Sequence, residues 1–298
     1  MLRTLLAGSA VLLSACSATA QTLPAPPVES VRTGAFQDPD LRESSGVARS
    51  RLLPRILFTI NDSGNEPIIF ATDSSGRPIG RWLIPGTRNR DWEAIAVGTC
   101  PAGSCIYVGD TGDNRERKKF VTIYRVREPA RLERFRGAAD PTPIDLDTLQ
   151  LRYPDGPHDT EAMWVDGDGA LSLVTKGRTG GILLFRVPAA AWEAHGTITA
   201  TRIQQLPITP DQAAGRWVTD AALAPDGSRV AIRTYTEIYF FPVLPAGRLG
   251  TPTSRCNVAG LEPQGEGVDW LDSARLILTS EAPFPAMAGP IHVIRCGA

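Results

Sequence analysis

Histidine and the sequence signatures of common hydrolases are scarce in this chain of 298 residues. It has three histidines and no Cys-x-x-Cys pair, which argues against a structural zinc ion. Gly-x-Ser-x-Gly, His-Glu-x-x-His and P-loop motifs are also absent, which removes the usual sequence markers of serine hydrolases, zinc proteases and P-loop nucleotidases. Any chemistry must therefore rest on other residue types.

The chain also lacks a surplus of either charge. It has 31 Lys and Arg residues and 32 Asp and Glu residues. This balance gives no excess of positive charge of the kind that indicates binding to nucleic acid or to a membrane surface. The N-terminal apolar run, residues 4–13, is too short to span a bilayer. A hydrophobic content of 42% excludes a disordered chain.

The N-terminus has the pattern of an export signal. Arg3 precedes the apolar run, and small residues follow it. Residues 13–16, Leu-Ser-Ala-Cys, resemble the lipobox of bacterial lipoproteins, whereas 18–20, Ala-Thr-Ala, fit an ordinary secretory cleavage site. We expect either a periplasmic or outer-membrane lipoprotein anchored through lipid on Cys16, or a secreted protein cleaved after Ala20.

These boundaries predict the domain organisation. Residues 1–15 would be the signal peptide, residues 16–29 a flexible tether rich in Ala, Thr and Pro, and residues 30–298 one domain. We expect this domain to be a monomer that touches the membrane only through the lipid.

Cysteine numbers suit an oxidising compartment. If Cys16 is lipidated, four cysteines remain, which is an even number suited to two disulfides. Cys100 and Cys105 flank a short turn that a disulfide could close, and Cys256 would then pair with Cys296. This is the most local of three possible connectivities.

A five-residue pattern recurs along the chain, with acids at its first or third position, then a small residue and an apolar one. Its copies are at 43–47, 91–95, 159–163, 218–222 and 264–268. Their third positions, 45, 93, 161, 220 and 266, are separated by 48, 68, 59 and 46 residues. A period near 50 residues predicts a propeller or a solenoid.

Between these copies the chain predicts short β-strands. The runs are rich in β-branched and aromatic residues and lie at 55–60, 67–71, 105–109, 121–126, 171–175, 182–187, 229–233, 237–241, 275–279 and 290–295. Each repeat thus has the strands of one antiparallel propeller blade. We predict an all-β propeller of five blades, or six if residues 128–158 form a degenerate one. Residues 28–36 would close the ring by pairing with the C-terminal strand.

In a propeller the first strand of each blade lines the central channel, so the repeated acids would meet at one mouth. A second column follows the second strand of each unit and reads Asp62, Asp110, Lys176, Arg233 and Glu281. Crowded carboxylates raise one another's pKa, and a hard cation relieves the repulsion. The alternative is structural, because such acids also accept hydrogen bonds from backbone N–H groups of neighbouring blades.

We predict calcium as the cofactor, since Ca²⁺ is bound through oxygen ligands alone. The candidate ligands are Glu43, Asp62, Asp91, Glu93, Asp110, Asp159, Glu161, Asp220 and Glu266. The candidate catalytic residues are Glu93, Glu161, Lys176 and Arg233. Residues 110–114 lack the ligand spacing of an EF-hand, and the basic run 115–119 predicts a solvated loop.

The motifs at 43–46, 61–64, 91–93, 109–114, 159–162 and 174–176 together resemble exported bacterial β-propellers of the phytase-like and TolB-like groups. The resemblance covers residues 40–180 well and the remainder mainly through the repeat. A phytase-like propeller implies calcium ions in the channel and basic residues that hold phosphate. In this chain those contacts would be Lys176, Arg178 and Arg233.

Two functions follow. The first is a calcium-dependent hydrolase acting on a phosphate ester; the alternative is a non-enzymatic envelope module that binds a small molecule, glycan, peptide or protein on a propeller face. A glycosidase is a third option, since such enzymes use two positioned carboxylates. Bound calcium would separate the first two.

Overall fold

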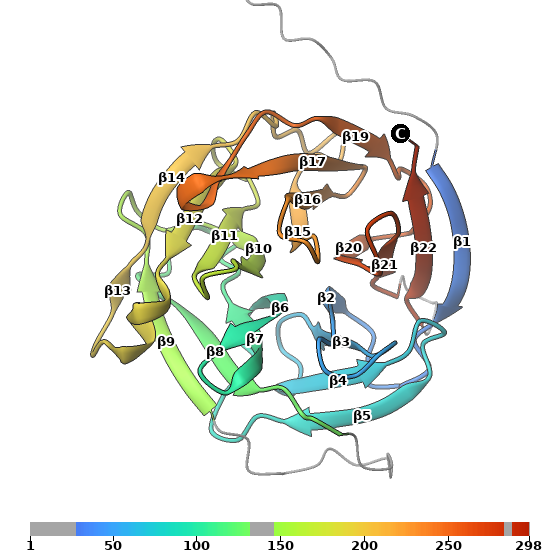
Figure 1. Ribbon diagram of the computed structural model, residues 1–298, viewed down its shortest axis with the longest axis horizontal. Helices are drawn as coiled ribbons and strands as arrows, with labels where there is room; N and C mark the ends of the chain where they lie inside the picture. Colours follow the sequence, from blue (N-terminus) through green and yellow to red (C-terminus); the bar gives the residue numbers. More distant parts are fainter. Residues whose placement is uncertain (1–27, 132–145, 283–287, 298) are drawn as a thin grey trace, which may run out of the picture.

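The computed structural model describes residues 28–131, 146–282 and 288–297. Five sheets are arranged as a ring around a common axis, as expected for a five-bladed propeller (Figure 1). The predicted signal peptide, Cys16 and residues 17–27 of the tether lie outside the described residues, but Val28 and Glu29 belong to the first strand. Within the described ranges, no helix has the length and apolar character needed to cross a membrane.

The first three blades follow the chain in order. Blade 1 contains β2 (Ser44–Arg49), β3 (Leu57–Asn61), β4 (Ile68–Thr72) and β5 (Pro78–Leu83). Blade 2 contains β6 (Trp92–Cys100), β7 (Gly103–Asp110), β8 (Val121–Arg127) and β9 (Leu146–Arg152), with β13 (Ile198–Thr199) added in parallel to β9. Blade 3 contains β10 (Thr160–Val165), β11 (Leu171–Thr175), β12 (Leu183–Val187) and β14 (Thr201–Gln205).

The last two blades complete the ring. Blade 4 contains β15 (Val218–Leu223), β16 (Arg229–Thr234), β17 (Glu237–Leu244), β18 (Arg248–Leu249) and β19 (Ser254–Asn257). Blade 5 contains β20 (Gly265–Trp270), β21 (Leu276–Ser280), β22 (Pro290–Cys296) and the N-terminal strand β1 (Val28–Ala35). Two short 3₁₀ helices, η1 (Ala189–Glu193) and η2 (Pro245–Gly247), lie between strands.

The N-terminal strand closes the ring as predicted. β1 pairs antiparallel with β22, from Val28 opposite Cys296 to Ala35 opposite Pro290. Closure in this way pairs the first strand with the last and removes a sheet edge. The sixth blade is not formed, because the described part of residues 128–158 supplies β9, the outer strand of blade 2.

The strands form where the sequence predicts because buried apolar side chains from facing blades pack against each other. The cluster between blades 2 and 3 contains 18 buried residues, among them Tyr107 and Phe185. The cluster between blades 5 and 1 contains 8, the largest being Phe36 and Phe70. Burial of these side chains is the main favourable term for the fold.

The cysteines join in the predicted pairs. Cys100 and Cys105 form a disulfide that closes the hairpin of β6 and β7. Cys256 in β19 and Cys296 in β22 form the second disulfide, which links blade 4 to blade 5. The ring closure is therefore held by a strand pairing and a covalent bond that meet at the same C-terminal strand.

Candidate metal centre at the channel mouth

The inner strand of every blade shifts register against its neighbour at the same point. One residue is skipped between Ser44 and Gly46 in blade 1, and the equivalent shift occurs in the other four. The skipped residues are Ser45, Glu93, Glu161, Thr219 and Glu266. A bulge of this kind re-aims a side chain, and such bulges are frequent next to functional sites.

This register corrects the alignment of the fourth copy. The sequence pattern placed Asp220 beside Glu93 and Glu161, but the residue at their position is Thr219. Asp220 occupies the place that holds Gly46, Ala94, Ala162 and Gly267 in the other blades. A shift of one residue is enough to move an acid from one side of a strand to the other.

The second column also needs correction at two positions. Counting from the residue that pairs just before each bulge, the equivalent residues are Asp62, Thr111, Lys176, Tyr235 and Glu281. Asp110 therefore lies one residue before its predicted place, and Arg233 lies two residues before it. Thr111 and Tyr235 are the members that the sequence pattern missed, and their only signal was their position directly after β7 and β16.

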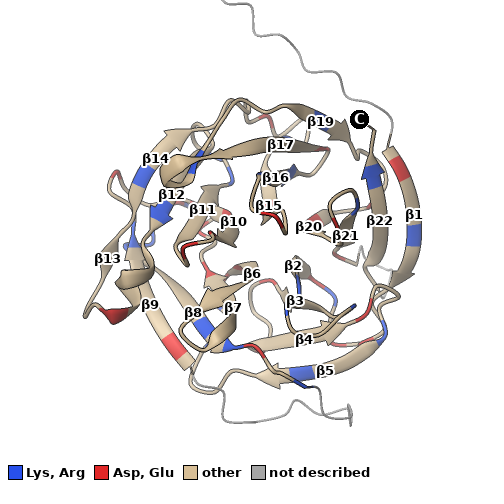
Figure 2. Ribbon diagram, in the orientation of Figure 1, with Lys and Arg blue, Asp and Glu red and all other residues tan. Residues whose placement is uncertain are grey.

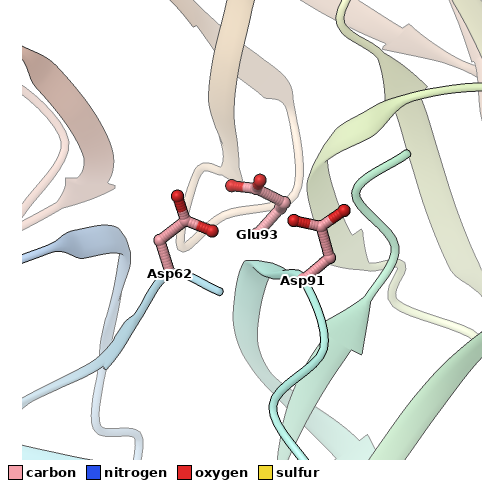
Figure 3. A group of neighbouring side chains, drawn as sticks. All are labelled: Asp62, Asp91 and Glu93. Atoms are coloured by element: carbon pink, nitrogen blue, oxygen red, sulfur yellow. The ribbon is translucent and has the colours of Figure 1, made fainter. Parts of the chain in front are cut away.

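Three of the predicted ligands come together at the channel mouth, which we define as the end where the inner strands begin and the second strands finish. Asp62 follows β3, Asp91 precedes β6, and Glu93 is the bulge residue of β6. One oxygen from each lies within 4.8 Å of the others. Figure 3 shows the three carboxylates pointing toward one another from blades 1 and 2.

Each carboxylate in this cluster is held at one oxygen and open at the other. Ser45 Oγ donates to Glu93 Oε2 at 2.6 Å, Lys118 Nζ lies 3.1 Å from Asp91 Oδ2, and the backbone N–H of Ser63 donates to Asp62 Oδ1. Within the described residues, no donor reaches Glu93 Oε1, Asp91 Oδ1 or Asp62 Oδ2. Glu93 is only 5% exposed, so protein surrounds most of this side chain.

Gly112 allows these acids to lie so close. A Cβ atom at this position would stand 2.7 Å from Asp91 Cγ and 2.7 Å from Glu93 Cγ. Only glycine therefore fits at this point of the loop after β7, next to the side chains of Asp91 and Glu93. This close approach accounts for the glycine that ends the Gly-Asp-Thr-Gly run at 109–112.

A buried cation lies beside the cluster. Lys176 Nζ is 2.8 Å from Glu161 Oε1, and the two side chains are 8% and 1% exposed. Burial alone would lower the pKa of Lys176, but the carboxylate of Glu161, with further acids around it, raises it. The Tyr235 ring lies 6.0 Å from the ammonium group. Lys176 is therefore a fixed positive charge among glutamates.

The surrounding acids retain protons more readily than ordinary carboxyl groups. Burial, with the charge of Glu161 second, raises the pKa of Glu93, and burial raises that of Glu161 to about 8 despite Lys176. Burial also raises the pKa of Glu281 to about 7 and that of Glu266 well above its usual value. When these four acids ionise, they outnumber the single lysine, and a bound cation would relieve their repulsion.

The other predicted ligands have protein partners. Asp220 accepts hydrogen bonds from Val268 N at 2.8 Å and Val47 N at 3.4 Å. Asp159 accepts Asp113 N at 2.8 Å and Arg178 Nε at 2.9 Å. The last three predicted ligands also accept hydrogen bonds. Asp110 accepts one from the backbone N–H of Asp91, Glu43 one from the Asn65 side chain, and Glu266 one from the Gln264 side chain.

The two predicted arginine contacts differ sharply. Arg233 is 1% exposed, pairs with Glu262 and donates to the carbonyl of Thr279 at 3.2 Å. Arg178 is 24% exposed in its ion pair with Asp159 and lies 4.5 Å from the Trp217 ring. Arg178 is thus the arginine that solvent can reach.

The basic run 115–119 is not simply a solvated loop. Lys118 forms the ion pair with Asp91, and the backbone N–H groups of Arg117 and Lys118 donate to Asp113, the first at 2.6 Å. Acidic positions gather around the channel in Figure 2. This loop supplies one of the few cations that balance them.

The chain matches no protein-family model and no curated protein. Among solved structures, it is similar to a PQQ-bound aldose sugar dehydrogenase from Streptomyces coelicolor, at 14% identity and TM-score 0.48, over 90% of this chain and 99% of that one. A gluconolactonase from Xanthomonas campestris matches at 13% identity and TM-score 0.45, over 91% and 90%. A second structure, described as a putative gluconolactonase, matches at 12% identity and TM-score 0.47, over 92% of this chain and 94% of that one. Similarity at this level carries no activity over to this chain.

Proposed function

We propose that this protein is a calcium-dependent hydrolase whose site is the channel mouth. One observation carries the proposal: Asp62, Asp91 and Glu93 converge within 4.8 Å, and each keeps a carboxylate oxygen that no donor among the described residues reaches. Hard cations such as Ca²⁺ take oxygen ligands of this kind. A bound Ca²⁺ would supply Lewis acidity toward a substrate oxygen.

The chain's own residues supply the remaining groups. Glu161, held by Lys176 at 2.8 Å, would accept a proton from water, because its raised pKa suits a base near neutral pH. Arg178 is positioned by Asp159 and Trp217 and would contact an anionic group of the substrate. A phosphate ester fits this combination of a hard cation site and an accessible arginine. Arg233 is left out, since its guanidinium is buried against Glu262.

Thermal unfolding with and without calcium tests the cation site. Calcium at about 100 times its dissociation constant should stabilise the protein by about 2.7 kcal/mol, a rise in Tm of roughly 5 to 10 °C. Glu93→Gln should abolish the rise, whereas Glu66→Gln, an exposed acid in the neighbouring β3–β4 loop, should keep it. An unchanged wild-type Tm would rule out the site.

Hydrolysis of p-nitrophenyl phosphate tests the reaction separately. Turnover should require calcium, disappear in Glu161→Gln and fall at least tenfold in Arg178→Gln. Calcium binding without turnover of this ester or of a carboxylic ester would eliminate the hydrolase and favour the envelope-binding alternative. Thermal unfolding thus tests calcium binding, and the ester assay tests hydrolysis independently.

A further inference from the structure

The seam between blades 5 and 1 is packed less fully than the seam between blades 2 and 3. Its apolar cluster has 8 buried residues against 18. A cleft of about 970 Å³ opens along it, between β1 and β22 on one side and the strands and turns of blade 1 on the other. A volume near the upper end of the range for small-molecule sites, about 300 to 1,000 Å³, is large enough for a ligand.

The cleft is lined by basic side chains. Arg49 ends β2, Arg55 lies in the turn that follows, Arg275 precedes β21 and Arg295 lies in β22, while Glu29 is the one acid among the described lining residues. Arg275 forms an ion pair with Asp272 at 2.7 Å. No ion pair forms at Arg49, Arg55 or Arg295 within the described parts of the chain. Three guanidinium groups are therefore available.

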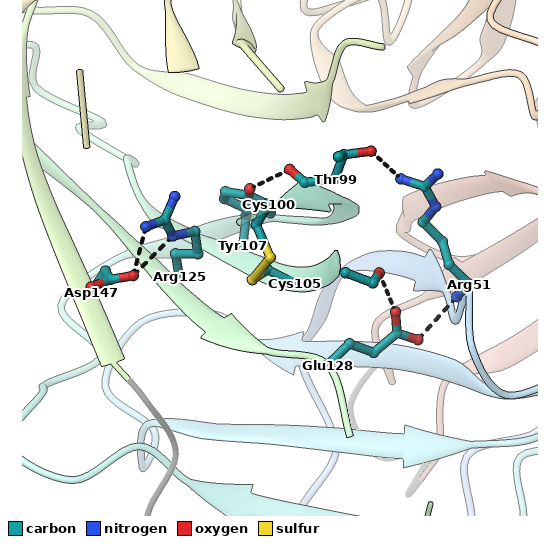
Figure 4. Close-up of a disulfide and its surroundings, with 9 residues drawn as sticks. Arg51, Thr99, Cys100, Cys105, Tyr107, Arg125, Glu128 and Asp147 are labelled. Atoms are coloured by element: carbon teal, nitrogen blue, oxygen red, sulfur yellow. Dashed lines mark hydrogen bonds and ion pairs between the residues drawn. A yellow bond between two sulfur atoms is a disulfide. The ribbon is translucent and has the colours of Figure 1, made fainter. Parts of the chain in front are cut away.

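The turn that carries Arg55 is fixed from the other side. Arg51 donates through its backbone N–H to Glu128 at 3.0 Å and through Nη1 to Thr99 Oγ1 at 2.9 Å, so the turn is tied to blade 2 (Figure 4). Leu52 N also donates to Glu128, at 3.2 Å. A basic group on a fixed turn loses less conformational entropy on binding than one on a free loop.

The cleft is also separate from the channel mouth. Arg49 and Arg275 lie at the far ends of β2 and β21 from the acids, since Ser44 begins β2 and Ser280 finishes β21. Leu57, Leu271 and Val293 add apolar wall between the arginines. The two regions thus have opposite charge and different linings.

We propose that this cleft, the seam cleft, binds a soluble small molecule carrying two or more phosphate groups. The guanidinium group of arginine binds phosphate oxygens through paired, charge-assisted hydrogen bonds. Three such groups form no ion pair among the described residues, although Glu29 lies opposite Arg295 and the charge of Arg49 acts on Asp269. They match a ligand of several negative charges better than a single carboxylate. The proposal does not depend on the reaction at the channel mouth.

Titration calorimetry with inorganic pyrophosphate in calcium-free buffer tests this. Wild-type protein should bind, and the double variant Arg55→Gln, Arg295→Gln should bind at least tenfold more weakly. Arg127→Gln, an exposed arginine at the end of β8, is the matched control and should bind within twofold of wild type. Since Arg55 and Arg295 are exposed, the double variant should keep its Tm.

Further titrations test which ligand chemistry is bound and at which site. Citrate should bind more weakly than pyrophosphate, and tighter binding of citrate would overturn the choice of phosphate. Glu93→Gln should leave pyrophosphate binding unchanged. Equal affinity in the wild type and the arginine double variant would overturn the proposal, as would loss of binding in Arg178→Gln, which would place the anion at the mouth instead.

Discussion

Glu93 and Asp220 belong to the same repeated pattern, yet they lie in different environments. Glu93 is the bulge residue of β6, and among the described residues its carboxylate accepts one hydrogen bond, from the hydroxyl of Ser45. Asp220 lies one position later in its strand and accepts backbone N–H groups from Val47 in blade 1 and Val268 in blade 5. The first carboxylate is open to a ligand, whereas the second ties three inner strands together.

The difference separates the two readings of the repeated acids. A structural acid has its oxygens occupied by backbone donors, while a ligand acid keeps an oxygen without one. By that criterion Asp220 is structural, and the cluster of Asp62, Asp91 and Glu93 is the part of the ring suited to a cation. The structural interpretation thus applies to Asp220, and the ligand role of the other three acids is our proposal.

The largest effect should come from removing the structural acid. Asp220→Ala leaves buried N–H groups of Val47 and Val268 without an acceptor, and each such group costs roughly 1 to 3 kcal/mol. We expect a loss of about 3 kcal/mol in the free energy of unfolding by urea denaturation. Glu93→Gln in calcium-free buffer should change it by less than about 1 kcal/mol. Equal losses in the two variants would show that Glu93 and Asp220 contribute to stability in the same way.

The next effect concerns the glycine beside the open cluster. Gly112→Ala places a Cβ 2.7 Å from the side-chain carbons of Asp91 and Glu93, so the carboxylates must move apart. We expect calcium affinity, measured by titration calorimetry, to fall more than tenfold, with a stability loss of roughly 1 to 3 kcal/mol from overpacking. Gly180→Ala, in the loop after β11, is the matched control, since no atom lies within 4 Å of its Cβ and its φ lies outside the left-handed region. Unchanged affinity in Gly112→Ala would mean that the cluster is not the site.

Much of the fold could be predicted from the sequence because the repeat marks each inner strand and β-branched runs mark the strands after it. The closing strand was predicted for the same reason: the last unit lacks a fourth strand. Site positions were harder, because a bulge moves the pattern by one residue. Nothing in the local sequence of blade 4 shows that Thr219, rather than Asp220, is skipped.

Partners in irregular segments were not predictable at all. Glu262 binds the Arg233 guanidinium from the segment between β19 and β20, and Lys118 reaches Asp91 from a loop. No period links these residues to their partners, since such contacts depend on how a loop folds back. The resemblance to phytase-like and TolB-like propellers stays a prediction from sequence, and so do export, lipidation and the monomeric state.

The pH dependence of stability should reveal the crowded acids around Lys176. The folded pKa values of Glu161 and Glu281, about 8 and about 7, exceed the ordinary value of 4.5. Their stabilising contribution is therefore complete below about pH 4.5 and is lost as pH rises through 7 to 8. Without calcium, Tm should be several degrees lower at about pH 8.5 than at about pH 5.5. Calcium should raise Tm most at the higher pH, and a flat profile would contradict a crowded acidic mouth.

The smallest effect should come from the cation that the chain itself places at the cluster. Lys118 and Asp91 form a partly exposed pair, with side chains 32% and 13% exposed, so Lys118→Gln should cost at most about 1 kcal/mol of stability. The same change frees Asp91 Oδ2 from its ammonium partner. Calcium affinity should therefore rise a few-fold in Lys118→Gln. It should stay unchanged in the control Lys119→Gln, because Lys119 is the next residue in the sequence and is exposed. Weaker binding in Lys118→Gln would show instead that the lysine positions Asp91 for the cation.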